Sequence, residues 1–174
     1  MDIIEKTIQY EADDFQLAYS THYRKKYPVR SRLVLIISAI SIIAGIVLFI
    51  YDMNKGGVFY KNFAAWFLLL YGMVIAIVFV KNMRTIGKRT LSKLPDFSRP
   101  LHYVFNIGEI QVSSETINNV NKWEHYQSAL FTGDLIMIYP NKYRFNFFPK
   151  KYFTDEEFSQ LKQWIQAKIK TKEC

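Results

Sequence analysis

Two long, uncharged runs of apolar residues constrain this chain more than any other feature of its sequence. They are Leu33–Tyr51 and Phe63–Val80, with nineteen and eighteen residues. Because an α-helix rises about 1.5 Å per residue, each run is long enough to cross the roughly 30 Å hydrocarbon core of a bilayer. The alternative is a very hydrophobic helical hairpin inside a globular core, but the remainder of the 174 residues is too small to cover one. The sequence therefore predicts two transmembrane helices.

The charges beside these runs predict how the chain is oriented. The eleven residues between the runs include the turn signal Gly56-Gly57, so the two helices are expected to be antiparallel neighbours. This connector has only Lys55 and Lys61 as basic residues. The outer flanks have more: Arg24, Lys25, Lys26, Arg30 and Arg32 before the first run, and Lys81, Arg84, Lys88, Arg89 and Lys93 after the second. Since basic flanks stay on the cytoplasmic side, both termini are expected in the cytoplasm of a bacterial cell, and the connector outside its inner membrane.

Small residues give each predicted span a face on which another helix can pack closely. The residues are Ser38, Ser41, Ala44 and Gly45 in the first span, and Gly72 and Ala76 in the second. We interpret them as packing of one span on the other, with a homo-oligomer interface as the alternative. No ionisable residue lies inside either span, which argues against an ion pathway or a transporter.

The segments outside the spans are expected to form an α+β domain. Residues 1–12 are predicted as a strand, and a helix capped by Asp13 is predicted from there to Pro28, either lying on the membrane or, as we favour, packing on the C-terminal domain. The basic segment from Lys81 is expected to continue the second helix. Further strands are expected at 101–107, 109–114, 115–118, 135–140 and 142–147, with 122–133 a strand or a short helix.

A final amphipathic helix is predicted from residue 154 to 170. Thr154 and Glu157 form a capping box, and an apolar stripe follows. The expected core of the domain consists of Trp123, Ile136, Ile138, Phe145, Phe147 and Trp164. Antiparallel strands finished by one helix are typical of a small pleckstrin-homology-like barrel.

The order of these elements resembles the YcxB-like membrane proteins of bacteria. The resemblance covers nearly the whole chain, through IGEIQVSSETI, KWEHY, LIMIYP, FFPKKYF and TDEEFSQLKQWI, and the family pattern falls on Trp123, Pro149, Lys150, Lys151 and Phe153. No single motif is specific. The resemblance implies a membrane-tethered cytoplasmic domain similar to bacterial pleckstrin-homology domains, and it implies no activity.

The expected organisation is therefore an α+β membrane protein with a transmembrane hairpin and a small antiparallel β domain. Its parts are an N-terminal strand and amphipathic helix (1–32), a transmembrane helix (33–51), an external loop (52–62), a second transmembrane helix (63–80), a basic juxtamembrane linker (81–100) and a cytoplasmic β domain with a C-terminal helix (101–174).

Basic residues are the candidate functional residues. The chain has a net charge of +8, and fifteen Lys or Arg against nine Asp or Glu follow residue 80. The candidates for binding anionic lipid or a partner are Arg84, Lys88, Arg89, Lys142, Arg144, Lys150 and Lys151. The alternative is a solvated strand face. Alternation in KYRFNF places its aromatic residues inward, which argues against binding of single-stranded nucleic acid.

Catalytic and metal chemistry is not indicated. His22, His102 and His125 lack metal-ligand spacing, and Cys174 is the one cysteine, so we expect no cofactor, metal or disulfide. Glu124 and His125 are expected to point to opposite faces of a strand. We therefore expect a non-enzymatic membrane protein whose cytoplasmic domain binds a protein partner or anionic lipid. The alternative is an immunity-type membrane protein that protects against a toxin or bacteriocin.

Overall fold

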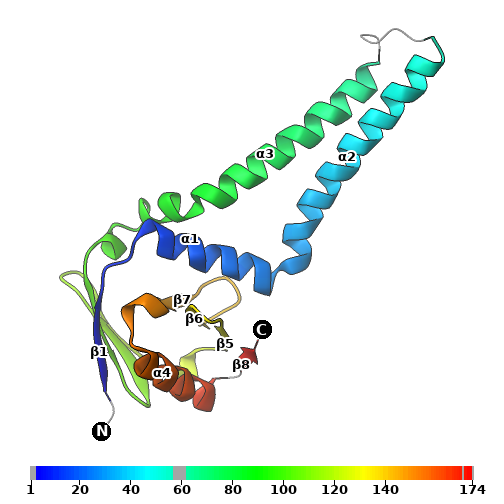
Figure 1. Cartoon of the computed structure of the whole chain (residues 1–174). Helices are drawn as coiled ribbons and strands as arrows, with labels where there is room; N and C mark the ends of the chain where they lie inside the picture. The colour runs from blue at the N-terminus through cyan, green and yellow to red at the C-terminus, as the bar shows by residue number, and fades with distance from the viewer. Residues whose placement is uncertain (1–2, 57–61, 170, 174) are drawn as a thin grey trace. The chain divides into compact units, whose positions relative to one another are not determined.

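The computed structural model describes residues 3–56, 62–169 and 171–173, and the chain forms two compact units (Figure 1). The hairpin unit consists of Tyr19–Ile86, and the sheet unit consists of Met1–Ala18 and Gly87–Cys174. Residues 57–61 of the expected 52–62 loop, with Gly57 and Lys61, lie outside the described residues, as do Lys170 and Cys174.

The hairpin unit contains the two long helices that the apolar runs predict. Helix α2 (Pro28–Asn54) follows a π-helix, η1 (His22–Lys26), and helix α3 begins in this unit and spans Phe63–Leu91. Proline suits the first turn of α2 because that position needs no backbone N–H donor. Both helices are long and apolar enough to span a membrane. The expected continuation of the second helix into the basic segment is confirmed as far as Leu91.

Small side chains lie between α2 and α3. The Ser38 hydroxyl donates a hydrogen bond of 2.7 Å to the carbonyl oxygen of Gly72. A Cβ atom on Gly72 would lie 2.8 Å from the Ser38 carbonyl oxygen, so only glycine permits this approach. The buried small residues at the contact are Ser38, Ser41, Gly45, Ala65 and Gly72. Packing of one helix on the other thus uses most of the small-residue face, whereas Ala44 and Ala76 are only half-buried.

The first sheet of the sheet unit joins the N-terminal strand to three strands that follow the second long helix. Its strand order is β1-β2-β3-β4 and every pair is antiparallel. The strands are β1 (Ile4–Ile8), β2 (Leu101–Phe105), β3 (Glu109–Ser113) and β4 (Asn118–Lys122). Ile4 pairs with Phe105 and Ile8 with Leu101, and all four side chains are buried. The N-terminal strand therefore belongs to the same fold as the strands after the second long helix.

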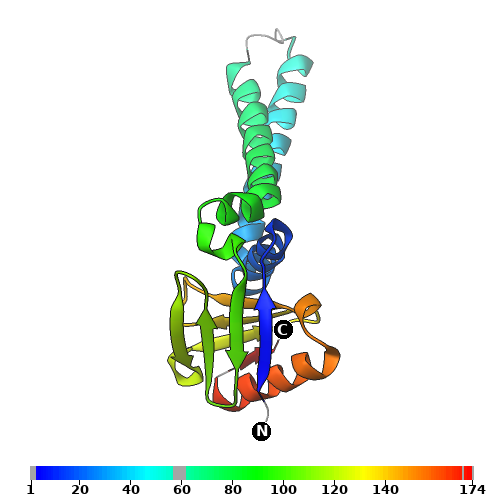
Figure 2. The same ribbon diagram turned by 90° about the vertical axis from the view of Figure 1, so that its left-hand side faces the viewer.

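The second sheet has the order β7-β6-β5-β8, and Figure 2 shows its strands crossing those of the first sheet. The strands are β5 (Ser128–Phe131), β6 (Leu135–Tyr139), β7 (Asn146–Pro149) and β8 (Thr171–Glu173). Strand β6 confirms the predicted buried strand, since all five of its side chains are buried. Strand β8, which pairs with β5 in parallel, was not predicted.

Helix α4 (Asp155–Lys168) lies at one end of the two sheets (Figures 1 and 2). Its predicted capping box is confirmed, because the Thr154 hydroxyl accepts from the Glu157 N–H and the Glu157 carboxylate accepts from the Thr154 N–H. Lys6 of β1 also binds Glu157, at 2.7 Å, and this hydrogen bond, with that from Thr154, lowers the pKa of Glu157. The beginning of α4 is therefore tied to β1.

The core contains most of the predicted residues. Trp123, Ile136, Ile138, Phe147 and Trp164 are buried, whereas Phe145 is only half-buried. The indole N–H of Trp123 donates to the Asn106 carbonyl oxygen at 2.9 Å, and this bond satisfies its polar atom inside the core. Trp123 belongs to a short 3-10 turn, η4 (Trp123–His125), which with β5 accounts for the segment expected as a strand or a short helix.

Helix α1 (Ala12–Thr21) packs within the sheet unit through its first half, as we favoured. Phe15 is buried against Phe147, with 5.1 Å between ring centroids. A Cβ atom on Gly87 would collide with the Ala12 carbonyl oxygen, so α1 and the end of α3 are in backbone contact. The predicted cap is wrong, because α1 begins at Ala12 and Asp13 lies inside its first turn.

We expect Trp164→Ala to lower the free energy of unfolding of the sheet unit by about 3–5 kcal/mol, since it removes a buried aromatic side chain from α4. The matched variant Gln163→Ala removes an exposed neighbour and should change it by less than about 0.5 kcal/mol. Urea titration followed by tryptophan fluorescence and circular dichroism measures both. Equal effects would mean that α4 does not contribute to the core.

Gly72→Ala should destabilise the helical hairpin by about 1–3 kcal/mol, despite the better helix propensity of alanine, because the added methyl meets backbone. Gly133→Ala is the control, since a Cβ atom there meets nothing within 4 Å. The measurement is SDS titration of the full chain in detergent. An unchanged midpoint for Gly72→Ala would show that the two helices are not in close contact.

Candidate functional site

The seven candidate basic residues fall into three groups in the structure. Arg84, Lys88 and Arg89 are exposed near the C-terminal end of α3, with Arg84 in the hairpin unit and the other two in the sheet unit. Lys142 and Arg144 are exposed between β6 and β7. Lys150 and Lys151 lie in the 3-10 turn η5 (Lys150–Tyr152), and both form ion pairs.

Lys142 and Arg144 lie on a loop, so their predicted placement on one face of a strand is wrong. The Asn141 side-chain oxygen accepts hydrogen bonds of 2.9 Å from the backbone N–H groups of Tyr143 and Arg144. An asparagine that binds the backbone two and three residues ahead forms a turn in competition with a strand. Strand β7 consequently begins only at Asn146.

The same turn leaves Tyr143 on the surface. Its side chain is 75% exposed, although alternation predicted that it would face inward. The Lys142 ammonium lies 5.0 Å from the centroid of the Tyr143 ring. The tip of this loop, which we call the basic–aromatic tip (residues 142–144), therefore presents one aromatic ring between two cationic side chains.

Lys151 has a different role, because it neutralises a buried carboxylate. Its ammonium lies 2.9 Å from Asp14 and 2.6 Å from Glu11. The Asp14 side chain is only 4% exposed, and its second oxygen accepts from the Glu11 N–H at 2.9 Å. Partial desolvation acts to lower the pKa of Lys151, but hydrogen bonds to Asp14 and Glu11 outweigh it and raise that pKa. This ion pair joins the N-terminal segment to the turn that follows β7.

Tyr152 completes the cluster around Asp14. Its hydroxyl lies 2.7 Å from the Asp14 Oδ2 atom and 2.7 Å from the Gln9 carbonyl oxygen. Burial, followed by the hydrogen bond to Asp14, raises the pKa of Tyr152 to about 12. The hydroxyl therefore keeps its proton at neutral pH and serves as a donor.

Lys150 forms a more exposed pair than its neighbour. Its ammonium lies 2.7 Å from Asp155 in the first turn of α4, where the Asp155 side chain is 79% exposed. The hydrogen bond to Asp155 raises the pKa of Lys150. A cavity of about 430 Å³ lies beside both lysines, and its wall includes Leu17, Pro149 and Phe153. Of the charged groups on this wall, Lys151 is paired with Asp14, and Lys150 is paired with Asp155.

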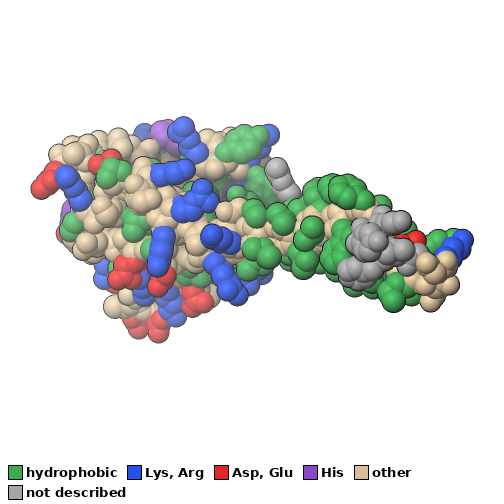
Figure 3. Space-filling view, turned by 90° about the horizontal axis from the view of Figure 1, so that it is seen from above, with side chains coloured by type: hydrophobic (Ala, Val, Ile, Leu, Met, Phe, Trp, Pro, Cys, Tyr) green, Lys and Arg blue, Asp and Glu red, His purple; other side chains and the backbone are tan. Residues whose placement is uncertain are grey.

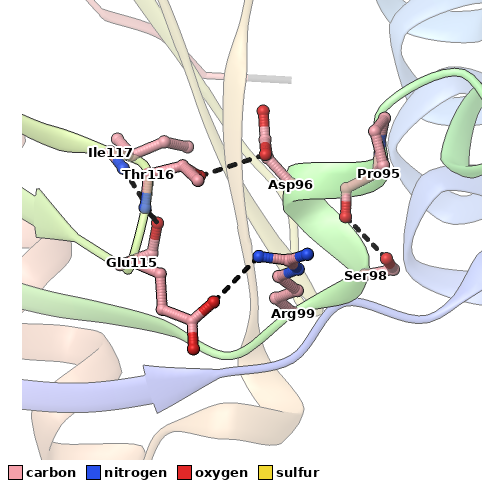
Figure 4. A network of polar contacts seen from close by, with 8 residues as sticks. Pro95, Asp96, Ser98, Arg99, Glu115, Thr116 and Ile117 are labelled. Carbon is pink, nitrogen blue, oxygen red and sulfur yellow. Dashed lines mark hydrogen bonds and ion pairs between the residues drawn. The ribbon is translucent and has the colours of Figure 1, made fainter.

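A further polar network, which the sequence did not predict, fastens the linker to the β3–β4 turn (Figure 4). Thr116 donates to Asp96 at 3.1 Å, and Arg99 binds Glu115 at 2.8 Å. The Ser114 hydroxyl accepts hydrogen bonds from the backbone N–H groups of Thr116 and Ile117, so residues 114–117 form a turn. The strand predicted at 115–118 is therefore wrong, and β4 begins at Asn118.

The histidines do not meet to form a metal site. Among the described residues, no group of three or more His, Cys, Asp or Glu side chains is arranged to hold a metal ion. Glu124 and His125 are both exposed and lie in the turn η4, so the expected strand alternation does not apply to them. His22 is buried, and this burial, with the nearby Lys26, lowers its pKa to about 4.

Comparison of the chain with protein-family models, with curated proteins and with solved structures found no match.

The two adjacent lysines should differ sharply in their contribution to stability. Lys151→Met leaves the buried Asp14 carboxylate without its cation and should cost about 1–2 kcal/mol, a value reduced because Lys151 is itself 45% exposed. Lys150→Met removes an exposed pair and should leave the urea midpoint unchanged within error. Asp14→Asn combined with Lys151→Met should recover part of the loss. Equal midpoints for the two single variants would contradict this assignment.

Proposed function

We propose that this chain is a bacterial inner-membrane protein without enzymatic activity, whose cytoplasmic sheet unit binds anionic lipid headgroups at the membrane surface. The observation that carries the proposal is the basic–aromatic tip. Hydrogen bonds to the Asn141 side chain form a turn there, and Tyr143, which lies between Lys142 and Arg144 in the sequence, is exposed to solvent.

Anchoring is supported by the apolar surface of α2 and α3. Figure 3 shows hydrophobic side chains along the hairpin, and large aliphatic residues are exposed on both helices, among them Ile40, Ile43 and Ile77. A soluble protein rarely exposes a continuous apolar surface of this extent. A bilayer accommodates it, because lipid tails replace water around these side chains.

Strand pairing supports an even number of membrane crossings. Strand β1 precedes both long helices and β2 follows them, yet the two strands pair over five residues. Segments in one sheet must lie on the same side of a membrane, so the chain between them must cross an even number of times. The two apolar helices meet this requirement, and the basic flanks favour the cytoplasm as the side of the sheet unit.

The lipid-binding surface that we propose is narrower than the seven candidates. Lys150 and Lys151 are assigned to the stability of the sheet unit, because carboxylates already compensate their charges. Within the sheet unit, Lys142 and Arg144 of the basic–aromatic tip carry the proposed surface, and Lys88 and Arg89 are further exposed cations of this unit. Arg84 belongs to the hairpin unit and is not part of this surface. Each cation close to an anionic leaflet contributes about 1 kcal/mol to the binding free energy, and tyrosine side chains are enriched at the level of the lipid headgroups.

A pleckstrin-homology-like fold and membership of the YcxB-like proteins remain part of this proposal. They are supported by two crossing sheets with a helix at one end and by the order of the elements along the chain. A protein partner at the same surface is the other outcome that the experiment below distinguishes.

Binding of the sheet unit to lipid vesicles, measured with a protein that lacks the helical hairpin, tests the proposal. The isolated 101–174 segment is unsuitable, because it lacks β1 and Asp14; residues 1–18 should instead be joined to 87–174 by a flexible linker. After a cooperative melt has been verified, binding to phosphatidylcholine vesicles should rise with phosphatidylglycerol content and fall steeply with salt.

The double variant Lys142→Glu/Arg144→Glu should weaken this binding at least tenfold. The control Lys122→Glu/Lys168→Glu changes the net charge equally at exposed positions and should have a much smaller effect. Equal losses would indicate diffuse charge attraction with no oriented surface. An absence of binding to anionic vesicles would reject lipid as the ligand and favour a protein partner.

A further inference from the structure

Tyr71 places a hydroxyl group in the middle of the second apolar run. It is the ninth of the eighteen residues in Phe63–Val80, so about 12 Å of helix separates it from the nearer end. A tyrosine side chain is too short to bring its hydroxyl from there to either edge of the run. Tyr51 differs, because it lies at the end of the first run and the Lys55 ammonium is 4.6 Å from its ring.

The Tyr71 side chain points away from the partner helix of the hairpin. It is 47% exposed, whereas Ala65 and Gly72 are buried at the contact with α2. Within the described part of the chain, no hydrogen bond engages the Tyr71 hydroxyl, in contrast with the Ser38 hydroxyl, which donates to Gly72. In hydrocarbon, a hydroxyl group without a partner is costly, since no water replaces the lost bond.

Tyr71 belongs to an exposed apolar stripe with the spacing of a packed helix pair. Phe67 stacks on Tyr71, with centroids 5.8 Å apart, and Val74 and Val78 continue the stripe. The intervals of four, three and four residues are those of heptad positions, which suit left-handed crossing of helices in a membrane. The hairpin contact does not use this face, so it is open to a second helix.

The geometry points to self-association of this chain in the membrane, through the Phe67–Tyr71–Val74–Val78 face of α3 packed on the same face of a second copy. Two copies inserted in the same direction place their Tyr71 residues at the same depth. A tyrosine hydroxyl both donates and accepts, so one such group satisfies another across a two-fold axis. A second copy is thus the occupant that supplies the missing partner at the required depth without any other protein. The inference rests on the membrane anchoring proposed above.

Disulfide crosslinking of the full chain in native membranes tests the face. In a Cys174→Ser background, Val78→Cys should give a crosslinked dimer on mild oxidation, whereas Met73→Cys, which is similarly exposed on another side of α3, should not. Equal crosslinking at both positions would indicate random collision and overturn the inference. A crosslink from Val78→Cys to a different protein alone would overturn it too.

The role of the hydroxyl is tested by energy transfer between labelled copies in liposomes at increasing dilution. Tyr71→Phe should weaken dimerisation about three- to tenfold, as expected for one hydrogen bond between transmembrane helices. Tyr51→Phe is the matched control and should leave dimerisation unchanged. Unchanged dimerisation for Tyr71→Phe, or a monomer at all densities, would refute the inference. If alkaline carbonate extracted the chain from membranes, the anchoring itself would be refuted, which separates that failure from this one.

Discussion

The pairing of β1 with β2 is the constraint on which the rest of the structure depends. These strands are separated by the whole helical hairpin, yet they share one sheet in which Ile4 lies opposite Phe105. Loop closure over such a long segment costs entropy, which the buried side chains of the pair and of the adjoining core offset. The Asp14–Lys151 ion pair and the Lys6–Glu157 pair reinforce this closure from other parts of the sheet unit. The N-terminal segment is thus an integral part of the sheet unit.

The basic residues of the sheet unit have two different roles. Lys151 pairs with a carboxylate that is almost completely buried, and Lys150 pairs with Asp155 at the beginning of α4, so both charges are compensated within the fold. Lys142 and Arg144 are instead held out by a turn that Asn141 builds. Net positive charge alone does not distinguish these cases, whereas the place of each residue in the fold does, in the turn η5 or on the exposed loop tip. The proposed lipid-binding surface follows from this difference.

Local patterns in the sequence predicted the elements that local forces determine. The two apolar runs, the buried strand β6 and the capping box of α4 are all confirmed, because each depends on neighbouring residues. The strand predicted through KYRFNF is wrong because one side-chain hydrogen-bonding pattern at Asn141 competes with alternation. Strand β8 is too short to produce a recognisable pattern.

The remaining features that the sequence did not predict are contacts between residues that lie far apart in the chain. The Asp14 and Lys151 side chains meet across 137 positions, and neither neighbourhood indicates the other. The candidate site shows the same division, since the sequence selected the basic residues by type and only the fold separated Lys150 and Lys151 in the turn η5 from Lys142 and Arg144 on the exposed loop. The Thr116–Asp96 contact of the linker could not be predicted for the same reason.

The side of the membrane on which the sheet unit lies tests the central claim most directly. Single cysteines introduced at Lys55 and at Tyr143, in a Cys174→Ser background, would be treated in intact cells with a thiol reagent that does not cross membranes. The account predicts labelling at residue 55 and protection at residue 143 until the cells are opened. Labelling of both positions in intact cells, or of residue 143 alone, would contradict a hairpin whose two ends and sheet unit lie in the cytoplasm.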